Sequence, residues 1–519
     1  MLRVEINLRV DNDNYQEEVL KLLKVKASDI KSISINKKSI DARRRDEIHY
    51  HYSIDVELAS KLEEKLLKNK KLKLKKVVKE EYQLPTSGDI KLPNRPVIVG
   101  SGPAGLFAAY ILASKGFKPL VIDRGEDMTK RVAKVTNFFT NGILDEESNV
   151  SFGEGGAGTF SDGKLKTMIR DKEHRGKKVF DIFIENGANS DILYLQHPHL
   201  GTDKLREIIP AIREKIIKMG GEFRFSTKLT DIKVKDAKVV SVTLNDKETV
   251  PCDVLVLAIG HSARDTFHLL DNVGLKMESK PFAVGVRVMH YQKMIDKEQY
   301  QNKIKKAPYK LTYQTKNHRG VYSFCMCPGG YVINSASENN SLVVNGMSNY
   351  LRDSNTANSA IVVTVSKKDY GEGLFAGVKY QQELEKKAYL KGNGKIPVEY
   401  YQDFLNKKIT KKETDFAILG AYTFTDLNDI LPLVISDSIK EAMIEFNKKI
   451  KNFSDSNPLL AGVETRTSSP IKIIRDEKLE SNIKGIYPCG EGSGYAGGIT
   501  SSAIDGIKVA EEIIKKYYY

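Results

Sequence analysis

The sequence predicts an α/β protein built around a mostly parallel β-sheet, and three features of the chain lead to that fold class. Short apolar runs at 97–99, 120–122 and 254–259 are typical of strands that are buried on both faces of a parallel sheet. The first and third of these runs end in glycine turns followed by helical patterns, so strands and helices alternate. Another glycine-rich turn precedes a helix near the C-terminus, which predicts that the chain returns to the same sheet.

The composition is that of a soluble globular protein with several domains. A chain of 519 residues is too long for one hydrophobic core and suggests two to four domains. Its four cysteines have no spacing that suggests a disulfide framework, which favours a reducing compartment. The N-terminus lacks the apolar core of a signal peptide, and no apolar run could span a bilayer. We therefore expect a cytoplasmic protein that does not contact a membrane.

The formal net charge of +15 permits an acidic partner such as nucleic acid. Lysine is spread along the whole sequence among Asp and Glu, which favours an ordinary solvated surface instead. The clearest basic clusters are residues 68–79 and 42–45. Nucleic acid is thus kept as an alternative partner and is not favoured.

Residues 1–90 predict a small N-terminal α/β module followed by a linker. Polar and apolar residues alternate in the three segments 2–10, 30–35 and 48–56, as in half-buried strands. Helical spacing occurs in two further segments, 15–23 and 58–67, so we expect a small sheet with helices on one face. We interpret the module as a docking or lid element. An RNA-binding tip is less favoured because no aromatic residues interleave its arginines.

A G-x-G-x-x-G turn at Gly100, Gly102 and Gly105 follows the first apolar run. The next apolar run, 120–122, stops at Asp123, close to the ~20-residue distance of a dinucleotide-binding βαβ unit. The first glycine permits a tight turn, the second lets backbone approach a pyrophosphate, and the third allows close helix packing. The helix N-terminus offers its N–H groups to the anion, and Asp123 is expected to accept hydrogen bonds from a ribose diol.

A second glycine-rich stretch, 153–163, predicts a loop that lies against a flat ligand, because glycine contributes no packing of its own. Farther along, Thr202 or Asp203 is predicted to cap the helix 204–218. Ser262 with Asp265 is predicted to form a capping box, which leaves His261 equally a turn residue or a catalyst.

From 281 to 462 the pattern changes to short strands and a few helices, which predicts a mixed-sheet domain inserted into the nucleotide-binding fold. This segment contains the sequence Cys325-Met326-Cys327. A redox pair is one interpretation, but a single intervening residue strains a disulfide. Two buried thiols on one face of a strand are therefore favoured.

The last glycine-rich turn starts at Gly490 and Glu491, runs to Gly498, and precedes a helix that reaches Ile514. Such a helix directs the positive end of its dipole and its unpaired N–H groups at an anion. Ordinary packing does not require this turn, so we predict a second anion-receiving helix N-terminus.

These motifs, in this order, resemble the FAD-dependent oxidoreductases with a glutathione-reductase-type flavin domain, and more narrowly the NAD(FAD)-utilizing dehydrogenases. The resemblance covers residues from about 95 to the end. It implies a three-layer, Rossmann-like FAD-binding domain with a mostly parallel sheet, an inserted mixed α+β substrate domain and a small N-terminal α/β module. The expected boundaries are 1–90 for the module and linker, 91–281 and 463–519 for the two parts of the FAD-binding domain, and 282–462 for the inserted domain.

The resemblance also implies which residues contact FAD. The first glycine motif would hold the ADP half, and Glu491 takes the ribityl position where relatives more often have Asp. The helix after Gly498 would point at the flavin N1 and C2 carbonyl, and its dipole would ease hydride uptake. The predicted cofactor-binding residues are Gly100, Ser101, Gly102, Pro103, Ala104, Gly105, Asp123, Arg124, Gly155, Gly156, Gly260, Gly490, Glu491, Gly497, Gly498 and Ile499.

The function implied is an FAD-dependent oxidoreductase that transfers a hydride between FAD and a small organic substrate. The sequence lacks the paired cysteines of disulfide reductases, and it lacks a second G-x-G-x-x-G unit in its middle part. NADH or NADPH would therefore act only as a transient donor. Lys164, Arg287 and Arg466 are candidates to bind an anionic substrate, although a structural ion pair explains each at least as well. The alternatives are a flavoprotein of RNA or tRNA modification and a non-catalytic FAD-binding sensor.

Overall fold

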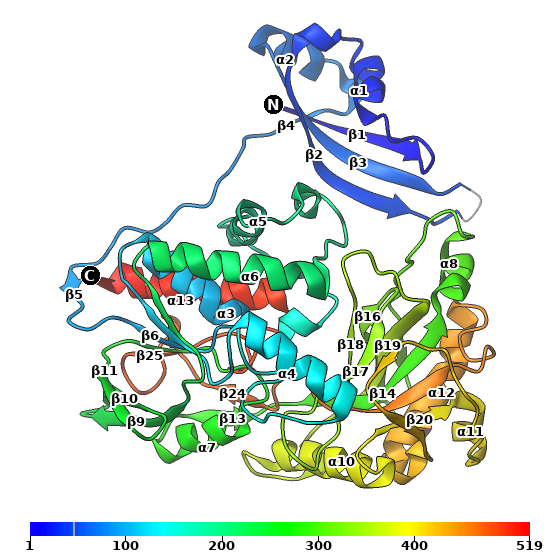
Figure 1. Ribbon diagram of the computed structural model, residues 1–519. Coiled ribbons are helices and arrows are strands. Elements are labelled where there is room, and N and C mark those ends of the chain that lie inside the picture. The colour runs from blue at the N-terminus through cyan, green and yellow to red at the C-terminus, as the bar shows by residue number, and fades with distance from the viewer. Residues whose placement is uncertain (45–46) are drawn as a thin grey trace.

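The computed structural model describes residues 1–44 and 47–519, and it groups the elements into three parts (Figure 1). A small N-terminal sheet lies at the top of the view, the parallel sheet with its helices lies below it, and a large mixed sheet lies to the right. The predicted α/β fold class with a Rossmann-like parallel sheet is confirmed. Arg45 and Asp46, which belong to the predicted basic tip, lie outside the described residues. The predicted domain boundaries stay predictions.

No helix within residues 1–44 and 47–519 is both long enough and apolar enough to cross a membrane.

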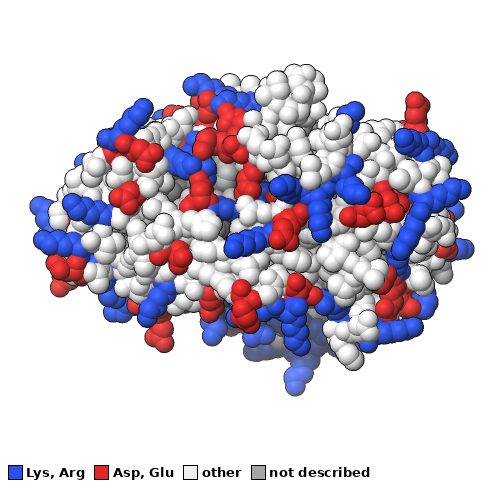
Figure 2. Space-filling view, turned by 90° about the horizontal axis from the view of Figure 1, so that it is seen from below, with Lys and Arg blue, Asp and Glu red and all other residues white. Residues whose placement is uncertain are grey.

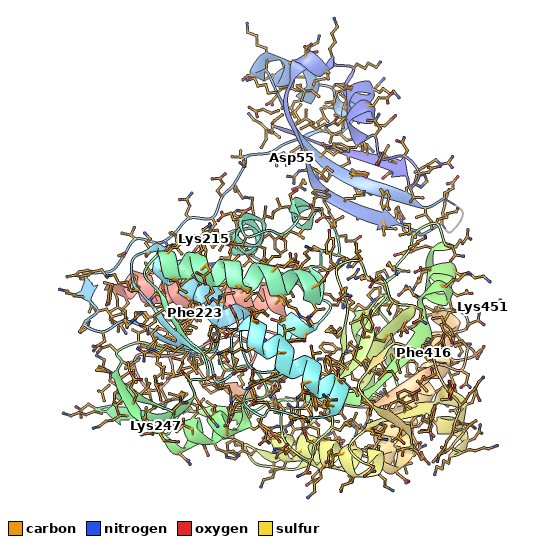
Figure 3. All side chains as sticks on the ribbon, in the orientation of Figure 1. Asp55, Lys215, Phe223, Lys247, Phe416 and Lys451 are labelled. Carbon is orange, nitrogen blue, oxygen red and sulfur yellow. The ribbon has the colours of Figure 1, made fainter. Side chains whose placement is uncertain are left out.

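The N-terminal sheet has the strand order β2–β3–β1–β4, and two helices pack against one of its faces. Val4 on β1 and Ile54 on β3 are fully buried against these helices. On the opposite face Arg3 donates to Asp55, at 2.6 Å between Nε and Oδ1; Figure 3 labels Asp55. Buried and more exposed side chains therefore alternate along β1 and β3, with the two-residue period of a strand that the sequence shows. The elements are β1 (Leu2–Arg9), α1 (Tyr15–Leu23), β2 (Ile30–Asp41), β3 (His49–Leu58), α2 (Ser60–Leu67) and β4 (Lys75–Lys76).

The central sheet has the order β25–β12–β6–β7–β8, and all its neighbouring strands are parallel. Its strands are β6 (Val97–Val99), β7 (Leu120–Ile122), β8 (Glu222–Arg224), β12 (Leu255–Leu257) and β25 (Ile486–Pro488). From β6 the chain continues to β7 and β8 on one side of the sheet, and it later adds β12 and β25 on the other side of β6. The strand order therefore reverses beside β6. Ligands of such sheets bind at this reversal, outside the carboxyl ends of the strands.

Two further layers cover the central sheet. Ile98 and Val256 pack onto the helical layer, whereas Val97 and Leu255 pack onto an antiparallel sheet and a helix on the other side. The helical layer consists of α3 (Pro103–Ser114), α5 (Arg175–Glu185), α6 (Gly201–Lys218) and α13 (Ile499–Lys516). The opposite layer consists of β9 (Leu229–Lys235), β10 (Lys238–Leu244), β11 (Glu248–Pro251) and α7 (Arg264–Asn272). The chain leaves this part after β13 (Met277–Ser279) and returns to it at β24 (Ile471–Ile473), and these two strands pair with each other. Helix α4 (Met128–Asn141) belongs to this part and packs its Val135 against Ile333 of the inserted segment.

The large mixed sheet has the order β15–β16–β19–β14–β23–β20–β22, with only β20 and β22 parallel. Its strands are β14 (Phe282–Tyr291), β15 (Thr312–Gln314), β16 (Gly320–Cys327), β19 (Thr356–Val365), β20 (Ile396–Tyr400), β22 (Tyr422–Phe424) and β23 (Leu459–Glu464). A smaller sheet holds β17 (Tyr331–Asn334), β18 (Val344–Met347) and β21 (Ile418–Leu419). The helices of this part are α8 (Gln292–Tyr300), α9 (Lys367–Tyr370), α10 (Ala376–Gly392), α11 (Tyr401–Asn406) and α12 (Leu433–Lys449).

The N-terminal sheet contacts the rest of the molecule through the edge of β2. The Lys38 N–H donates to the Tyr194 carbonyl at 2.7 Å, and the Gln196 N–H donates to the Lys38 carbonyl at 2.9 Å. The linker then adds β5 (Ile90–Lys91) alongside β26 (Tyr517–Tyr518) at the C-terminus (Figure 1). The module is thus tied down at both its edge strand and its linker.

Charges of both signs are mixed on the face shown in Figure 2, where lysine and arginine side chains alternate with acidic ones. The positive net charge does not gather into a single patch on that face.

Candidate functional site

Four turns at the carboxyl edge of the central sheet meet at one cavity of about 360 Å³. They follow β6, β7, β12 and β25, which lie side by side in register, so the residues after each strand end at the same edge. The inserted part of the chain closes the cavity with Phe324, Cys325 and Asn345. The two glycine motifs that are far apart in sequence therefore face the same space.

The first turn brings the start of α3 to the cavity. Gly100 has φ +102°, and a Cβ there would collide with the Ala258 carbonyl oxygen. A Cβ on Gly105 would collide in the same way with the Gly100 carbonyl, so these two glycines set the close approach of turn and helix. Gly102 is the N-cap of α3 and has no side chain to cap the helix, which leaves the N–H groups of its first turn open to a ligand.

Asp123 at the end of β7 holds this turn in place. Its Oδ2 accepts hydrogen bonds from the Ser101 N–H at 2.9 Å and the Ser101 hydroxyl at 2.6 Å, and its Oδ1 accepts from the Gly125 N–H at 2.9 Å. Asp123 is buried and lines the cavity. Arg124 beside it pairs with Asp265 at 2.8 Å and lies over the Phe152 ring, so its charge is already neutralised.

The glycine-rich loop 153–163 lies directly on the first turn. A Cβ on Gly156 would be 2.9 Å from the Gly102 Cα, so the two backbones are in contact. Arg131, which is fully buried, donates to the carbonyl oxygens of Gly153 and Glu154 and shapes the loop from behind. The sequence analysis missed this arginine, because its partners are carbonyl groups about 20 residues away. Ser161 to Lys164 continue along the cavity wall.

The C-terminal turn supplies the opposite wall. Glu491 lines the cavity, and burial raises the pKa of its carboxyl group to about 7, partly offset by the charge of Lys280. Gly498 is the N-cap of α13 and, like Gly102, offers no side-chain cap. A Cβ on Gly497 would meet nothing within 4 Å, and the same holds at Gly260 after β12. At these two positions no side chain covers the backbone where it lines the cavity.

The structure brings most of the predicted cofactor-binding residues to this cavity. Those that line it are Gly100, Gly102, Pro103, Ala104, Asp123, Arg124, Gly156, Gly260, Glu491, Gly497, Gly498 and Ile499. Four others support the wall from behind. Ser101 bonds to Asp123, Gly105 packs on the Gly100 carbonyl, Gly155 packs on Thr159 and Ile209, and Gly490 packs on Ala104.

The three candidate substrate-binding cations have different positions. Lys164 lines the cavity and pairs with Asp162 at 3.1 Å. Arg466 also lines it and pairs with the fully buried Glu385 at 2.8 Å. Arg287 does not line the cavity: it is fully buried and pairs with Glu464 at 2.8 Å, so the structural alternative is the correct one for this residue.

Both predicted helix caps are wrong. Helix α6 begins at Gly201 without a side-chain cap, because Thr202 donates to the Thr159 carbonyl and Asp203 accepts from the Tyr350 N–H. Helix α7 begins at Arg264 after an uncapped Ala263. The hydroxyl of Ser262 instead bonds to the ring of His261 at 2.9 Å, and Asp265 pairs with Arg124. Tertiary partners thus outcompete the local caps.

Two titratable residues of the cavity wall, His261 and Cys325, were given no definite role by the sequence. His261 lines the cavity, and burial together with the charges of Arg466 and Arg264 lowers the pKa of its imidazole to about 4, which makes it neutral at neutral pH. Cys325 also lines the cavity and is half-buried, whereas Cys327 is buried. The interpretation of two buried thiols is therefore correct for Cys327 only.

Comparison with known families identifies three segments of the chain. Residues 281–467 match the family described as FAD-dependent protein, C-terminal domain-like. Residues 98–154 match an NAD(P)-binding Rossmann-like domain, and residues 1–57 match a domain of unknown function.

Among solved structures, glycine oxidase from Bacillus cereus is similar over 81% of this chain and 94% of that chain, with 13% identity and a TM-score of 0.32. Quinol fumarate reductase FrdA of E. coli is similar over 82% of this chain and 70% of that chain, with 11% identity and a TM-score of 0.38.

A protein of Clostridium beijerinckii, described as uncharacterized, is 45% identical over 529 residues, which span 99% of this chain and 98% of the relative. The matched span covers 99% of this chain, so it extends over the N-terminal module, the central sheet and the inserted segment. The chain therefore belongs to the family of the Clostridium beijerinckii protein and carries the C-terminal domain of an FAD-dependent protein at residues 281–467.

Proposed function

We propose that the protein is an FAD-dependent oxidoreductase, of the kind of the NAD(FAD)-utilizing dehydrogenases, that transfers a hydride between FAD and a small organic substrate. The observation that carries the proposal is the convergence of two separate glycine turns on one cavity, which the inserted part of the chain closes. A cavity with FAD-type glycine turns on one side and a different domain on the other would place a bound cofactor next to residues that can contact a second reactant.

The residues of the cavity fit FAD. The N-termini of α3 and α13 both open onto it, and neither has a side-chain cap, so unpaired N–H donors are available to an anionic ligand. At Gly497 a side chain would enter empty space, and the backbone does not have a positive φ there, yet the sequence has glycine. Both features are expected where backbone approaches a cofactor and neither contributes to packing.

The two ends of the cavity suit different parts of FAD. The turn from Gly100 to Gly105, with Asp123, would hold the ADP half, because it combines a helix N-terminus for phosphate with a carboxylate for ribose hydroxyls. The turn from Glu491 to Gly498 would hold the flavin half. FAD supplies the hydride-accepting chemistry when it is bound. The dipole of α13 favours negative charge at the flavin end of the cavity.

Charged and titratable side chains of the cavity wall would receive the substrate. Lys164 and Lys166 both line the cavity, and the positive charges of Lys37 and Lys310 act on Lys166 from two other parts of the molecule. This gathering of lysines favours an anionic substrate. Glu491, with a pKa of about 7, can hold or release a proton near neutral pH, and the neutral His261 can accept a hydrogen bond.

Anaerobic titration of the purified protein with NADH and with NADPH tests the proposal. We expect a yellow protein whose flavin absorbance is lost on addition of one of the two nucleotides, which would identify it as the transient donor. A colourless protein that cannot be reconstituted with FAD would contradict the proposal. A yellow protein that no donor, including dithionite, can reduce would favour the sensor alternative instead.

A further inference from the structure

Asn345 on β18 closes the cavity together with Phe324 and Cys325, and the orientation of its amide is fixed. Its Oδ1 accepts two hydrogen bonds, from Nη2 of Arg287 at 2.9 Å and from the Gly346 N–H at 2.7 Å. A guanidinium and a backbone N–H can only donate, so the amide atom that faces both of them must be the oxygen. The NH2 group therefore lies on the other branch of the Asn345 side chain.

This NH2 group is left for a ligand. No atom in the described part of the chain accepts a hydrogen bond from Nδ2 of Asn345. Arg287, which holds the oxygen, is fully buried and does not line the cavity, whereas Asn345 is half-buried and does. Asn358 shows the contrast, because its Oδ1 also accepts from Arg287, at 2.7 Å, but its Nδ2 is fully buried. Of the two amides that Arg287 holds, only that of Asn345 presents its donors to the cavity.

The guanidinium of Arg287 is itself held on several sides. Its Nε donates to Glu464 at 2.8 Å, and its Nη1 donates to the Cys325 carbonyl at 3.1 Å. A Cβ on Gly346 would collide with Nη1, so glycine at this position of β18 makes room for the guanidinium. The donor that faces the cavity is thus preorganised, which lowers the cost of binding a ligand to it.

The wall beside Asn345 also carries more positive than negative charge. Three cations and two carboxylates form an ion-pair cluster with distances of 2.6 to 3.1 Å: Lys164, Arg287, Arg352, Asp162 and Glu464. The Lys164 ammonium and Nη1 of Arg287 both lie 4.0 Å from the Cys327 sulfur, so the ammonium and the Asn345 amide belong to the same stretch of wall. An ammonium has three N–H donors, and Asp162 occupies one of them. Lys164 therefore has donors left for a ligand in the cavity.

We propose that Asn345 and Lys164 together bind a carboxylate group of the second reactant, with the amide NH2 donating to one oxygen and the ammonium to the other. Arg287 does not contact this group and acts by orienting the amide. A single carboxylate balances the one excess charge of the cluster, whereas a phosphate ester carries nearly two. The inference rests on the proposed function for the role of the ligand as substrate, and it names the substrate class as a carboxylic acid.

Acetate is the probe for the test, and acetamide is its neutral counterpart of nearly the same size. Saturation-transfer NMR on the purified holoprotein near neutral pH, at constant chloride concentration, gives a dissociation constant for each. We expect acetate to bind at least about tenfold more tightly, because hydrogen bonds to a charged acceptor are the stronger ones. Acetamide binding as tightly as acetate would overturn the proposal.

Asn345→Asp is the decisive variant. One of its oxygens can still accept from Arg287 and Gly346, while the other places a negative charge where the NH2 group was. Its affinity for acetate should fall at least about tenfold. Lys164→Met, which leaves Asp162 paired with Arg352, should show a similar loss and provides a second readout if the first variant folds poorly.

Two control variants make the same changes of charge on exposed residues elsewhere. Asn137→Asp and Lys411→Met should bind acetate as the parent protein does. Unchanged affinity in Asn345→Asp or in Lys164→Met would overturn the proposal. Absence of acetate binding in the parent protein would also overturn it, and is the result expected if a thiolate of Cys325 or Cys327 balances the charge of the cluster instead.

The outcome is distinguishable from that of the flavin titration. A flavin that a nucleotide reduces, in a protein without the acetate site, would leave the proposed hydride transfer standing and remove this substrate class. A colourless protein that binds acetate through Asn345 and Lys164 would support the carboxylate site and contradict the proposed function.

Discussion

At the scale of single residues, the site depends on ion pairs whose partners are far apart in the sequence. Arg466 was predictable as a charged residue near the C-terminal turn, but its partner Glu385 lies on α10. Glu385 is fully buried and also pairs with Arg264 at 2.9 Å, so one carboxylate holds two arginines beside the cavity. Such a cluster tolerates the loss of a member poorly, because the remaining charges are left buried without compensation.

Glu385→Gln is expected to destabilise the protein by about 3 to 5 kcal/mol, because it removes the carboxylate that pairs with Arg466 and leaves Arg264 with Glu338 alone. Urea unfolding at pH 7 measures this. Glu207→Gln, which breaks an exposed pair with Lys204, is the control and should cost less than about 1 kcal/mol. Although burial raises the pKa of Glu385, the two arginines hold it well below its usual range. The stabilisation is therefore present above pH ~4.5 and lost as the pH falls further, so the two proteins should converge in acid.

Glu491 is expected to show the opposite dependence on pH. Burial raises the pKa of its carboxyl group to about 7, so the folded protein holds a proton between about pH 4.5 and 7 that the unfolded chain has released. Its contribution to stability therefore falls as the pH rises through this window. Flavin-free Glu491→Gln should match the parent protein at pH 5 and exceed its stability by about 1 to 3 kcal/mol at pH 8. Equal stabilities at both pH values in urea unfolding would contradict the assignment.

At the scale of elements, the glycine turns are the parts that local sequence predicts best. Their spacing and the adjoining apolar runs are contained within about thirty residues, and the structure places both turns on one cavity. The helix caps were predicted poorly, because Thr202 and Asp203 bond to the glycine loop and to Tyr350 instead. A short polar side chain can form a hydrogen bond with a distant segment as readily as with the first turn of its own helix.

Gly497→Val tests whether the C-terminal turn must stay bare. The new side chain would meet no protein atom within 4 Å of its Cβ, so we expect the unfolding free energy to change by less than about 1 kcal/mol. The side chain would enter the cavity, so the affinity for FAD, measured by quenching of flavin fluorescence, should fall at least about tenfold. Gly116→Ala, at the far end of α3 with φ +83°, is the control: it should cost about 1 kcal/mol and leave FAD affinity intact. Unchanged FAD affinity in Gly497→Val would place the cofactor elsewhere.

At the scale of the whole molecule, the N-terminal sheet is attached by a small contact between backbone groups. Lys38 on the edge of β2 exchanges two hydrogen bonds with the segment from Tyr194 to Gln196. The same edge carries Lys37 toward Lys166 at the cavity. The contact fits the predicted docking role, because it brings positive charge close to the cavity. The module also has a hydrophobic core of its own.

Lys38→Pro should detach the module without unfolding it. Proline removes the N–H that donates to Tyr194 but is tolerated on an edge strand. We expect trypsin to cleave the linker near Lys79 several times faster than in the parent protein, while the remaining chain keeps FAD. Lys38→Ala retains the N–H and should behave as the parent protein does. Equal cleavage rates for both variants would show that other contacts hold the module.

The sequence by itself determined the parallel sheet, the two glycine turns and the small N-terminal α/β module, because strand and helix periods and turn chemistry are local properties. Only the tertiary structure decided which charges face the cavity. The register between β14 and β23 buries Arg287 against Glu464, although the two are 177 residues apart. A bulge against β19 directs Cys325, but not Cys327, to the cavity. Such placements depend on strand pairing over long separations, which residue pattern alone does not encode.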